Sequence, residues 1–130
     1  MKLHHIGVAV ANLDEGIKHY EALGLKLAHR ERVDSQQVEV AFVGERPWIE
    51  LVAGTHPDSG VSQFIVKRGP GQHHVAFAVP SIAAELKKQE AAGAALIDKA
   101  ARPGAWGHIV AFLHPKDQGG VLIELVEEAH

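Results

Sequence analysis

The stretch His4-His5-Ile6-Gly7-Val8-Ala9-Val10 near the start of the chain recurs 69 residues later as His73-His74-Val75-Ala76-Phe77-Ala78-Val79. Each copy is followed, about 45 to 50 residues on, by an acid in an apolar run: Ile49-Glu50-Leu51-Val52 after the first and Ile123-Glu124-Leu125-Val126 after the second. The sequence is therefore predicted to be a duplicated half-domain in which each copy contributes one histidine and one carboxylate.

The bulk composition is that of a globular protein with a single core. The chain has 130 residues, of which 46% are hydrophobic and 22% charged, enough for one domain and too few for two ordinary ones. A formal charge of −3 disfavours general nucleic-acid binding, and we expect a cytoplasmic protein that does not enter the membrane. Because the chain has no cysteine, any metal ion has to be held by nitrogen and oxygen ligands.

Hydrophobic periodicity in the first half predicts a strand, a helix and three further strands. Residues 4–10 alternate in the manner of a strand. Asn12 and Asp14 provide the chemistry of a helix start, and Gly24 that of a helix stop. The apolar stripe between them has helical spacing and consists of Leu13, Ile17, Tyr20 and Leu23. The further strands are expected near residues 25–33, 38–43 and 48–52.

The second half is predicted to repeat this order. A strand is expected over residues 73–79, and Ser81 is the predicted N-cap of a helix that runs to Ala92 and stops at Gly93. Later strands are expected near residues 94–98, 108–113 and 121–126, and a linker helix at about 60–68. The predicted fold class is α+β: one domain, residues 1–130, with two tandem βαβββ modules at roughly 1–55 and 70–130.

Strand alternation distinguishes the two histidines of each pair. The second histidine of each pair, His5 or His74, shares its strand face with glycine and alanine, whereas the first, His4 or His73, lies among bulky residues. Bulky faces pack against helices, and small side chains leave room for a ligand. His5 and His74 are therefore the candidate site residues, and His4 and His73 are expected to be structural.

The two acids complete a candidate metal site. Glu50 and Glu124 each lie among apolar neighbours, where a buried carboxylate without a partner would be costly and a divalent cation is a strong partner. Together with His5 and His74 they form a set of two imidazoles and two carboxylates. Such a set suits Co(II), Mn(II), Ni(II), Fe(II) or Zn(II), and four protein ligands on a six-coordinate metal leave two positions open. Exposed positions are expected for His19, His29 and His56, and His130 is terminal. Structural roles are expected for His108 and His114, with contact to the substrate as the alternative for either.

These motifs resemble the vicinal oxygen chelate superfamily, which includes glyoxalase I, extradiol dioxygenases and fosfomycin-resistance proteins. Within it, the chain resembles the methylmalonyl-CoA epimerase family nearly end to end. Beside the histidine pairs, the resemblance is carried by Pro57-Asp58-Ser59-Gly60, Arg102-Pro103-Gly104-Ala105, Phe112-Leu113-His114-Pro115-Lys116 and Gly119-Gly120-Val121-Leu122-Ile123-Glu124-Leu125.

The resemblance implies a curved mixed sheet around a metal site, with His5, Glu50, His74 and Glu124 as the metal ligands. The implied reaction interconverts (2R)- and (2S)-methylmalonyl-CoA through an enolate, which needs an acid/base group on each face; Glu39 and Glu124 are the candidates. Glu39 has an alternative interpretation as a solvent-facing strand residue.

Further expectations concern partners and alternatives. A homodimer is expected, and basic residues that could contact the phosphates of an acyl-CoA substrate are Lys67, Arg68, Arg102 and Lys116. The alternatives are a glyoxalase-like metal-dependent lyase or isomerase and a non-catalytic small-molecule binding protein of the same fold.

Overall fold

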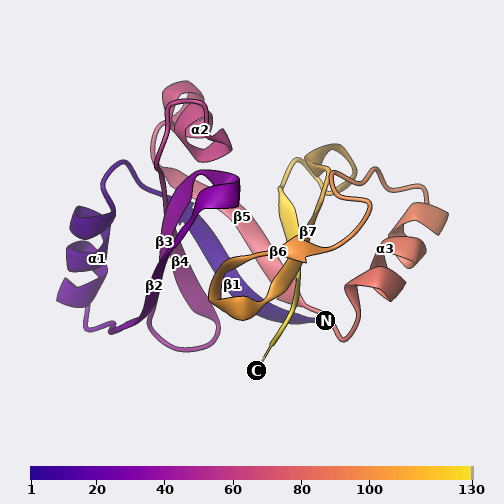
Figure 1. Cartoon of the computed structure of the whole chain (residues 1–130), viewed down its shortest axis with the longest axis horizontal. Helices are drawn as coiled ribbons and strands as arrows, with labels where there is room; N and C mark the ends of the chain where they lie inside the picture. The colour runs from indigo at the N-terminus through magenta and orange to yellow at the C-terminus, as the bar shows by residue number, and fades with distance from the viewer. Residues whose placement is uncertain (130) are drawn as a thin grey trace. The chain divides into compact units, whose positions relative to one another are not determined.

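The computed structural model describes residues 1–129 and contains the βαβββ unit twice (Figure 1). The first unit consists of β1 (Lys2–Ala9), α1 (Leu13–Ala22), β2 (Leu27–Val33), β3 (Val38–Val43) and β4 (Trp48–Gly54). The helix α2 (Gly60–Arg68) follows. The second unit consists of β5 (Gly71–Ala78), α3 (Ile82–Ala91), β6 (Arg102–Pro103), β7 (Ile109–Leu113) and β8 (Ile123–Glu127). The predicted order of elements is confirmed.

The chain divides into two compact parts. The first part is residues 5–73, and the second joins residues 1–4 to the described residues from 74 onward. Across residues 1–129, no helix is both long and apolar enough to cross a membrane.

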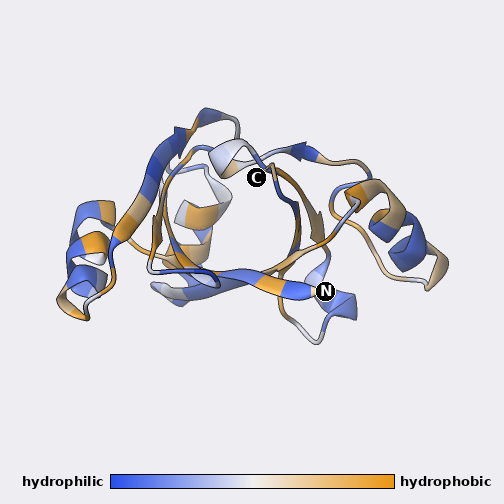
Figure 2. Cartoon of the chain, turned by 90° about the horizontal axis from the view of Figure 1, so that it is seen from below, coloured by the Kyte–Doolittle hydropathy of each residue, from blue (hydrophilic) through white to orange (hydrophobic). Residues whose placement is uncertain are grey.

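The sheet of the first part has the strand order β2-β3-β4-β1. β1 and β4 are parallel, β3 is antiparallel to both of its neighbours, and β2 forms an edge. α1 covers one face, where Leu13 and Ile17 pack on Ala41, Val43 and other residues of β3 and β4. Figure 2 shows hydrophobic and hydrophilic residues on α1, as expected of a helix with one buried side.

The start and the end of α1 both follow the predicted capping chemistry, and one residue of the predicted apolar stripe does not. The side chain of Asn12 accepts a hydrogen bond from the backbone N–H of Glu15 at 2.9 Å. Gly24 adopts a φ of +94° just after the helix, which a residue with a Cβ rarely adopts. Leu23, predicted to continue the apolar stripe, is 69% exposed and lies outside the core, because the helix has already ended at Ala22.

The sheet of the second part has the corresponding order β5-β8-β7-β6. β5 and β8 are parallel, and the remaining pairs are antiparallel. Ile82 and Leu86 of α3 pack on a cluster that includes Leu125 of β8. The hydroxyl of Ser81 accepts a hydrogen bond from the N–H of Ala84, which confirms the predicted N-cap. Glu127 Oε1 accepts a second hydrogen bond at this helix start, from the N–H of Ile82 at 2.9 Å.

One predicted strand, at residues 94–98, is wrong. This segment makes only an isolated bridge between Leu96 and Leu113, and the strand that pairs with β7 is Arg102–Pro103. The N–H groups of Ile97 and Asp98 both donate to the carbonyl of Phe112, and Asp98 Oδ2 accepts the N–H of Phe112 at 2.9 Å. Because these bonds converge on one residue, the segment does not form a regular ladder with β7.

Candidate metal centre

The first part of the chain brings His5 and Glu50 together, as predicted. His5 lies on β1 and Glu50 on the parallel strand β4, where Glu50 stands beside Gly7 in the register. His5 Nε2 is 3.3 Å from Glu50 Oε1. The residues are only 3% and 7% exposed, so both polar groups are held in the interior.

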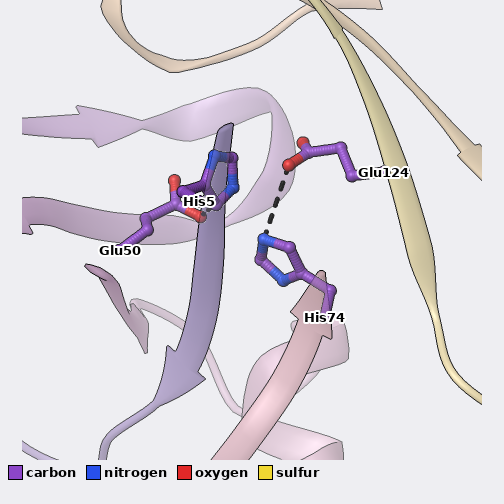
Figure 3. A group of neighbouring side chains, drawn as sticks. All are labelled: His5, Glu50, His74 and Glu124. Carbon is purple, nitrogen blue, oxygen red and sulfur yellow. Dashed lines mark ion pairs between the residues drawn. The ribbon is translucent and has the colours of Figure 1, made fainter. Parts of the chain in front are cut away.

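The second part repeats this pair with His74 and Glu124. His74 Nε2 of β5 lies 3.4 Å from Glu124 Oε1 of β8, the ion pair marked by the dashed line in Figure 3. These residues are 5% and 7% exposed. Here Ala76 stands beside the glutamate in the parallel register, in the place that Gly7 has in the first part. The second pair therefore has nearly the same length and burial as the first.

A phenylalanine contacts the histidine of each pair. The Phe42 ring meets the His5 ring edge-on, with centroids 5.6 Å apart and planes at 90°. Phe112 meets His74 in the same way, at 5.9 Å and 87°. Each phenylalanine also stands directly opposite the glutamate of its pair on the neighbouring antiparallel strand. The conformation of each imidazole is thus fixed by an apolar ring as well as by the acid.

His5 and Glu50 in the first part, and His74 and Glu124 in the second, are buried donors of the kind that could hold a metal ion. Each residue offers one nitrogen or one carboxylate oxygen, the ligand types that divalent first-row metals accept. Carboxylates this deeply buried need compensation, and a cation is stronger compensation than a neutral imidazole. The residues present therefore fit the metal that the sequence predicts.

Glu39 lies on the face of the first sheet that α1 covers. It shares the alternation of Ala41, which packs against α1, whereas Phe42 and Glu50 belong to the opposite face. The carboxylate of Glu39 accepts a hydrogen bond from Arg30 Nε at 3.0 Å. The structure therefore does not bring Glu39 together with His5 and Glu50, and its placement matches the alternative interpretation of a surface strand residue.

The Arg30 guanidinium joins Glu39 to the start of α1. Its Nη1 donates to Asp14 Oδ1 at 2.7 Å. Hydrogen bonds to Glu39 and then to Asp14 raise the pKa of Arg30 above its usual range. Glu39 therefore has a structural role: Arg30 of β2 joins it, on β3, to Asp14 of α1.

The first histidine of each pair has a structural environment, as predicted. His4 is buried, with Nε2 3.7 Å from Glu128 Oε1 and its ring 5.2 Å from that of His108. His108 is also buried, and its Nδ1 accepts the N–H of Ala129 at 2.9 Å. His73 packs edge-on against Phe64 of α2, with centroids 4.9 Å apart.

His29 is a site-face residue that the sequence interpretation assigned to the surface. On β2 it stands opposite Phe42, so it shares the face that carries Glu50. Its Nε2 is 2.7 Å from Glu31 Oε1. The spacing of His29 and Glu31 shows only that the two residues share a face, because residues two apart on a strand point to the same side. The run His29-Arg30-Glu31-Arg32 is polar throughout, however, so hydropathy could not show which side that is.

Comparisons with known proteins agree with the fold. A Bacillus subtilis protein named YqjC is 38% identical over 128 residues, covering 97% of this chain and 91% of that protein. The crystal structure of methylmalonyl-CoA epimerase from Mycobacterium tuberculosis matches with a TM-score of 0.94 and 38% identity, covering 99% of this chain and 89% of that one.

A second solved structure was determined with a bound ligand. It is a variant of the Streptomyces coelicolor methylmalonyl-CoA epimerase in complex with 2-nitronate-propionyl-CoA, with a TM-score of 0.94 and 32% identity, covering 99% of this chain and 95% of that one. The model of the glyoxalase/bleomycin resistance protein/dioxygenase superfamily matches residues 4–112. The α+β fold predicted from the two βαβββ modules is thereby confirmed, and the chain belongs to the glyoxalase/bleomycin resistance protein/dioxygenase superfamily.

Proposed function

We propose that this chain is an epimerase that interconverts (2R)- and (2S)-methylmalonyl-CoA by removing and returning the α-proton. The observation that carries the proposal is the matched, buried pairs His5–Glu50 and His74–Glu124. Relatives that cover nearly the whole chain and bear the name methylmalonyl-CoA epimerase support the choice of substrate.

The four paired residues are the proposed ligands of one divalent ion, shared by the two modules. When bound, such an ion supplies Lewis acidity that stabilises developing negative charge on the thioester oxygen, an effect worth several kcal/mol. The protein holds the four donors in the dry interior, where Phe42 and Phe112 limit rotation of the two imidazoles. Because each module provides only half of the ligands, we infer that residues 1–130 act as a single domain.

Glu124 has a second proposed role as one of the two proton carriers. Its carboxylate takes the α-proton of one epimer and leaves a planar enolate, or gives a proton to that carbon in the reverse direction. Inversion requires the other proton transfer to occur on the opposite face of the enolate. Two features suit Glu124 to this proton transfer: His74 Nε2 lies 3.4 Å from its Oε1, and its side chain is nearly excluded from bulk water.

The acyl-CoA partner, the oligomeric state and the compartment complete the proposal. Arg68 and Lys67 end α2, and the Arg68 guanidinium lies 5.8 Å from the centroid of the Phe64 ring. These cations, with Lys116 and Arg102, are the proposed contacts for the CoA phosphates. A homodimer located in the cytoplasm remains our prediction.

The proposal is tested by exchange of the α-hydrogen in D₂O. Protein stripped with a chelator and reloaded with Co(II) or Mn(II) is incubated with (2S)-methylmalonyl-CoA, and deuterium at C2 and the fraction of (2R) product are measured. We expect both to appear with the loaded protein and neither with the stripped protein. Loaded protein that binds one ion per chain yet catalyses no exchange would refute the epimerase function and leave a glyoxalase-like enzyme or a binding protein.

A further inference from the structure

Inversion at the α-carbon needs a second proton carrier beside Glu124, and this inference rests on the proposed function. The family resemblance suggested Glu39 as this second proton carrier. Its side chain, however, lies on the face of the sheet that α1 covers and accepts a hydrogen bond from Arg30. A carrier contributed by the first module has to lie on the other face, which bears His5 and Glu50.

The strand register identifies every titratable residue on that face within residues 5–73. Phe42 stands opposite Glu50 on β4 and opposite His29 on β2. Val40, two residues before Phe42, stands opposite Glu31. Since directly opposed residues of antiparallel strands point to the same side, His29 and Glu31 share the face of the candidate metal ligands. In this part of the chain, the titratable side chains on that face of the strands are His5, His29, Glu31 and Glu50.

His29 and Glu31 form a hydrogen-bonded dyad close to the first metal-ligand pair. His29 Nε2 and Glu31 Oε1 are 2.7 Å apart, and the two side chains are 28% and 33% exposed. The ring of Phe42 lies near both histidines: its centroid is 6.5 Å from that of His29 and 5.6 Å from that of His5. The dyad is therefore accessible to a ligand, whereas His5 and Glu50 are almost fully enclosed.

We propose that the His29–Glu31 dyad is the second proton carrier of the reaction. With Glu31 ionised, the 2.7 Å contact requires the imidazole proton on Nε2, so Nδ1 carries the ring lone pair. The C2–H bond breaks, its proton forms a bond to Nδ1, and its electron pair enters the enolate. Glu124 then gives its own proton to the opposite face of C2. The reverse direction uses the same two groups in the opposite order, and solvent exchange resets the enzyme.

Paired substitutions test the assignment. His29→Gln and Glu31→Gln each alter the dyad, and Glu39→Gln is the matched control, since it removes a carboxylate from the same sheet on the face that α1 covers. Each protein, loaded with the same divalent ion, is incubated in D₂O with either epimer, and inversion, deuterium at C2 and bound metal are measured. For the dyad variants we expect inversion to fall by about 100-fold or more, with one bound ion per chain retained.

The distinguishing result is exchange without inversion. With the dyad disabled, Glu124 should still exchange the α-hydrogen of the one epimer that it serves, with retention of configuration, while the other epimer stays unlabelled. Glu39→Gln should behave as the unaltered protein.

Other outcomes each overturn the dyad. Inversion at the unaltered rate would show that it carries no proton, with the epimerase function itself untouched. Loss of the bound ion from the dyad variants would mean that the dyad supports the metal site. Loss of exchange for both epimers, with the ion retained, would contradict the assignment of one proton carrier to each face of the enolate. The absence of exchange in the unaltered protein would instead remove the proposed function. Circular dichroism shows whether the glutamine variants are folded. If they are not, His29→Asn and Glu31→Asp replace them in the same measurements of inversion, deuterium at C2 and bound metal.

Discussion

The two modules agree around the proposed metal ligands and differ at the edge of each sheet. Each places a histidine, a glutamate and a phenylalanine in the same relation, with histidine–glutamate separations of 3.3 and 3.4 Å. Beyond the phenylalanine they diverge: His29 lies near Phe42, whereas the Arg102 guanidinium lies 5.3 Å from the centre of the Phe112 ring. The two modules therefore share the arrangement of the proposed ligands, whereas their outer strands carry different residues.

The outer strands explain this divergence. β2 runs for seven residues, long enough to place both His29 and Glu31 on one face. β6 has two residues, one of them Pro103, and its Arg102 is paired with Asp98 at 3.3 Å. Only the first module therefore has room for a dyad on its outer strand. If both proposals hold, equal halves of a metal site coexist with different proton carriers in the two modules.

The largest expected difference between the modules is that between Glu50→Gln and Glu124→Gln. Both variants weaken metal binding, but only Glu124 has a proposed proton to move. At saturating metal we expect Glu50→Gln to recover most of its turnover and Glu124→Gln to remain about 100-fold or more below the unaltered protein. Steady-state turnover as a function of metal concentration measures this. Equal recovery of the two variants would make Glu124 a metal ligand alone.

The next comparison concerns the two phenylalanines. Phe42→Ala removes a ring that is 1% exposed, so it should lower the free energy of unfolding by about 3–5 kcal/mol. Phe112 is only partly buried, and Phe112→Ala should cost less in spite of the lost contact with Arg102. Urea unfolding of both metal-free variants measures the difference. A larger loss for Phe112 would mean that the contacts of its ring outweigh burial.

A smaller difference is expected between the two helix starts. Asn12→Ala leaves the first turn of α1 without its side-chain cap and should cost about 1 kcal/mol of folding stability. Ser81→Ala should cost less, because Glu127 still accepts the N–H of Ile82 at the start of α3. Thermal unfolding of the two variants decides the order, and adding Glu127→Ala to Ser81→Ala should remove the advantage of α3.

The smallest effect is expected for Glu39→Gln. Arg30 keeps its bond to Asp14, and exposed ion pairs contribute at most about 1 kcal/mol. Folding stability should therefore fall by less than about 1 kcal/mol, and turnover should be unchanged. A marked loss of turnover at full metal occupancy would restore Glu39 as a proton carrier.

Sequence patterns predicted the parts of the structure that depend on alternation and on helix caps. Small neighbours beside His5 and His74 indicated the strand faces that also carry Glu50 and Glu124, and Ser81 marked the start of α3. The facing of Glu39 was harder, because both faces of β3 are apolar: Val40 and Phe42 on one side, Ala41 and Val43 on the other. Alternation separates the two sets but does not say which one meets α1.

The remaining differences arise from contacts between segments distant in sequence. The expected strand at 94–98 depended on local apolar content, but its N–H groups converge on Phe112, about fourteen residues away. His29 became a candidate only when the register of β2 against β3 was known. Neither pairing has a local sequence signal.

The position of β2 at the end of its sheet has a consequence for association between molecules. A strand with an open backbone side invites another chain to extend the sheet, and charged side chains are a common protection against this. β2 carries Arg30, Glu31 and Arg32 in succession. A foreign strand paired with β2 would place its own side chains beside His29 and Glu31, so charges that disfavour such pairing would also leave the proposed dyad uncovered.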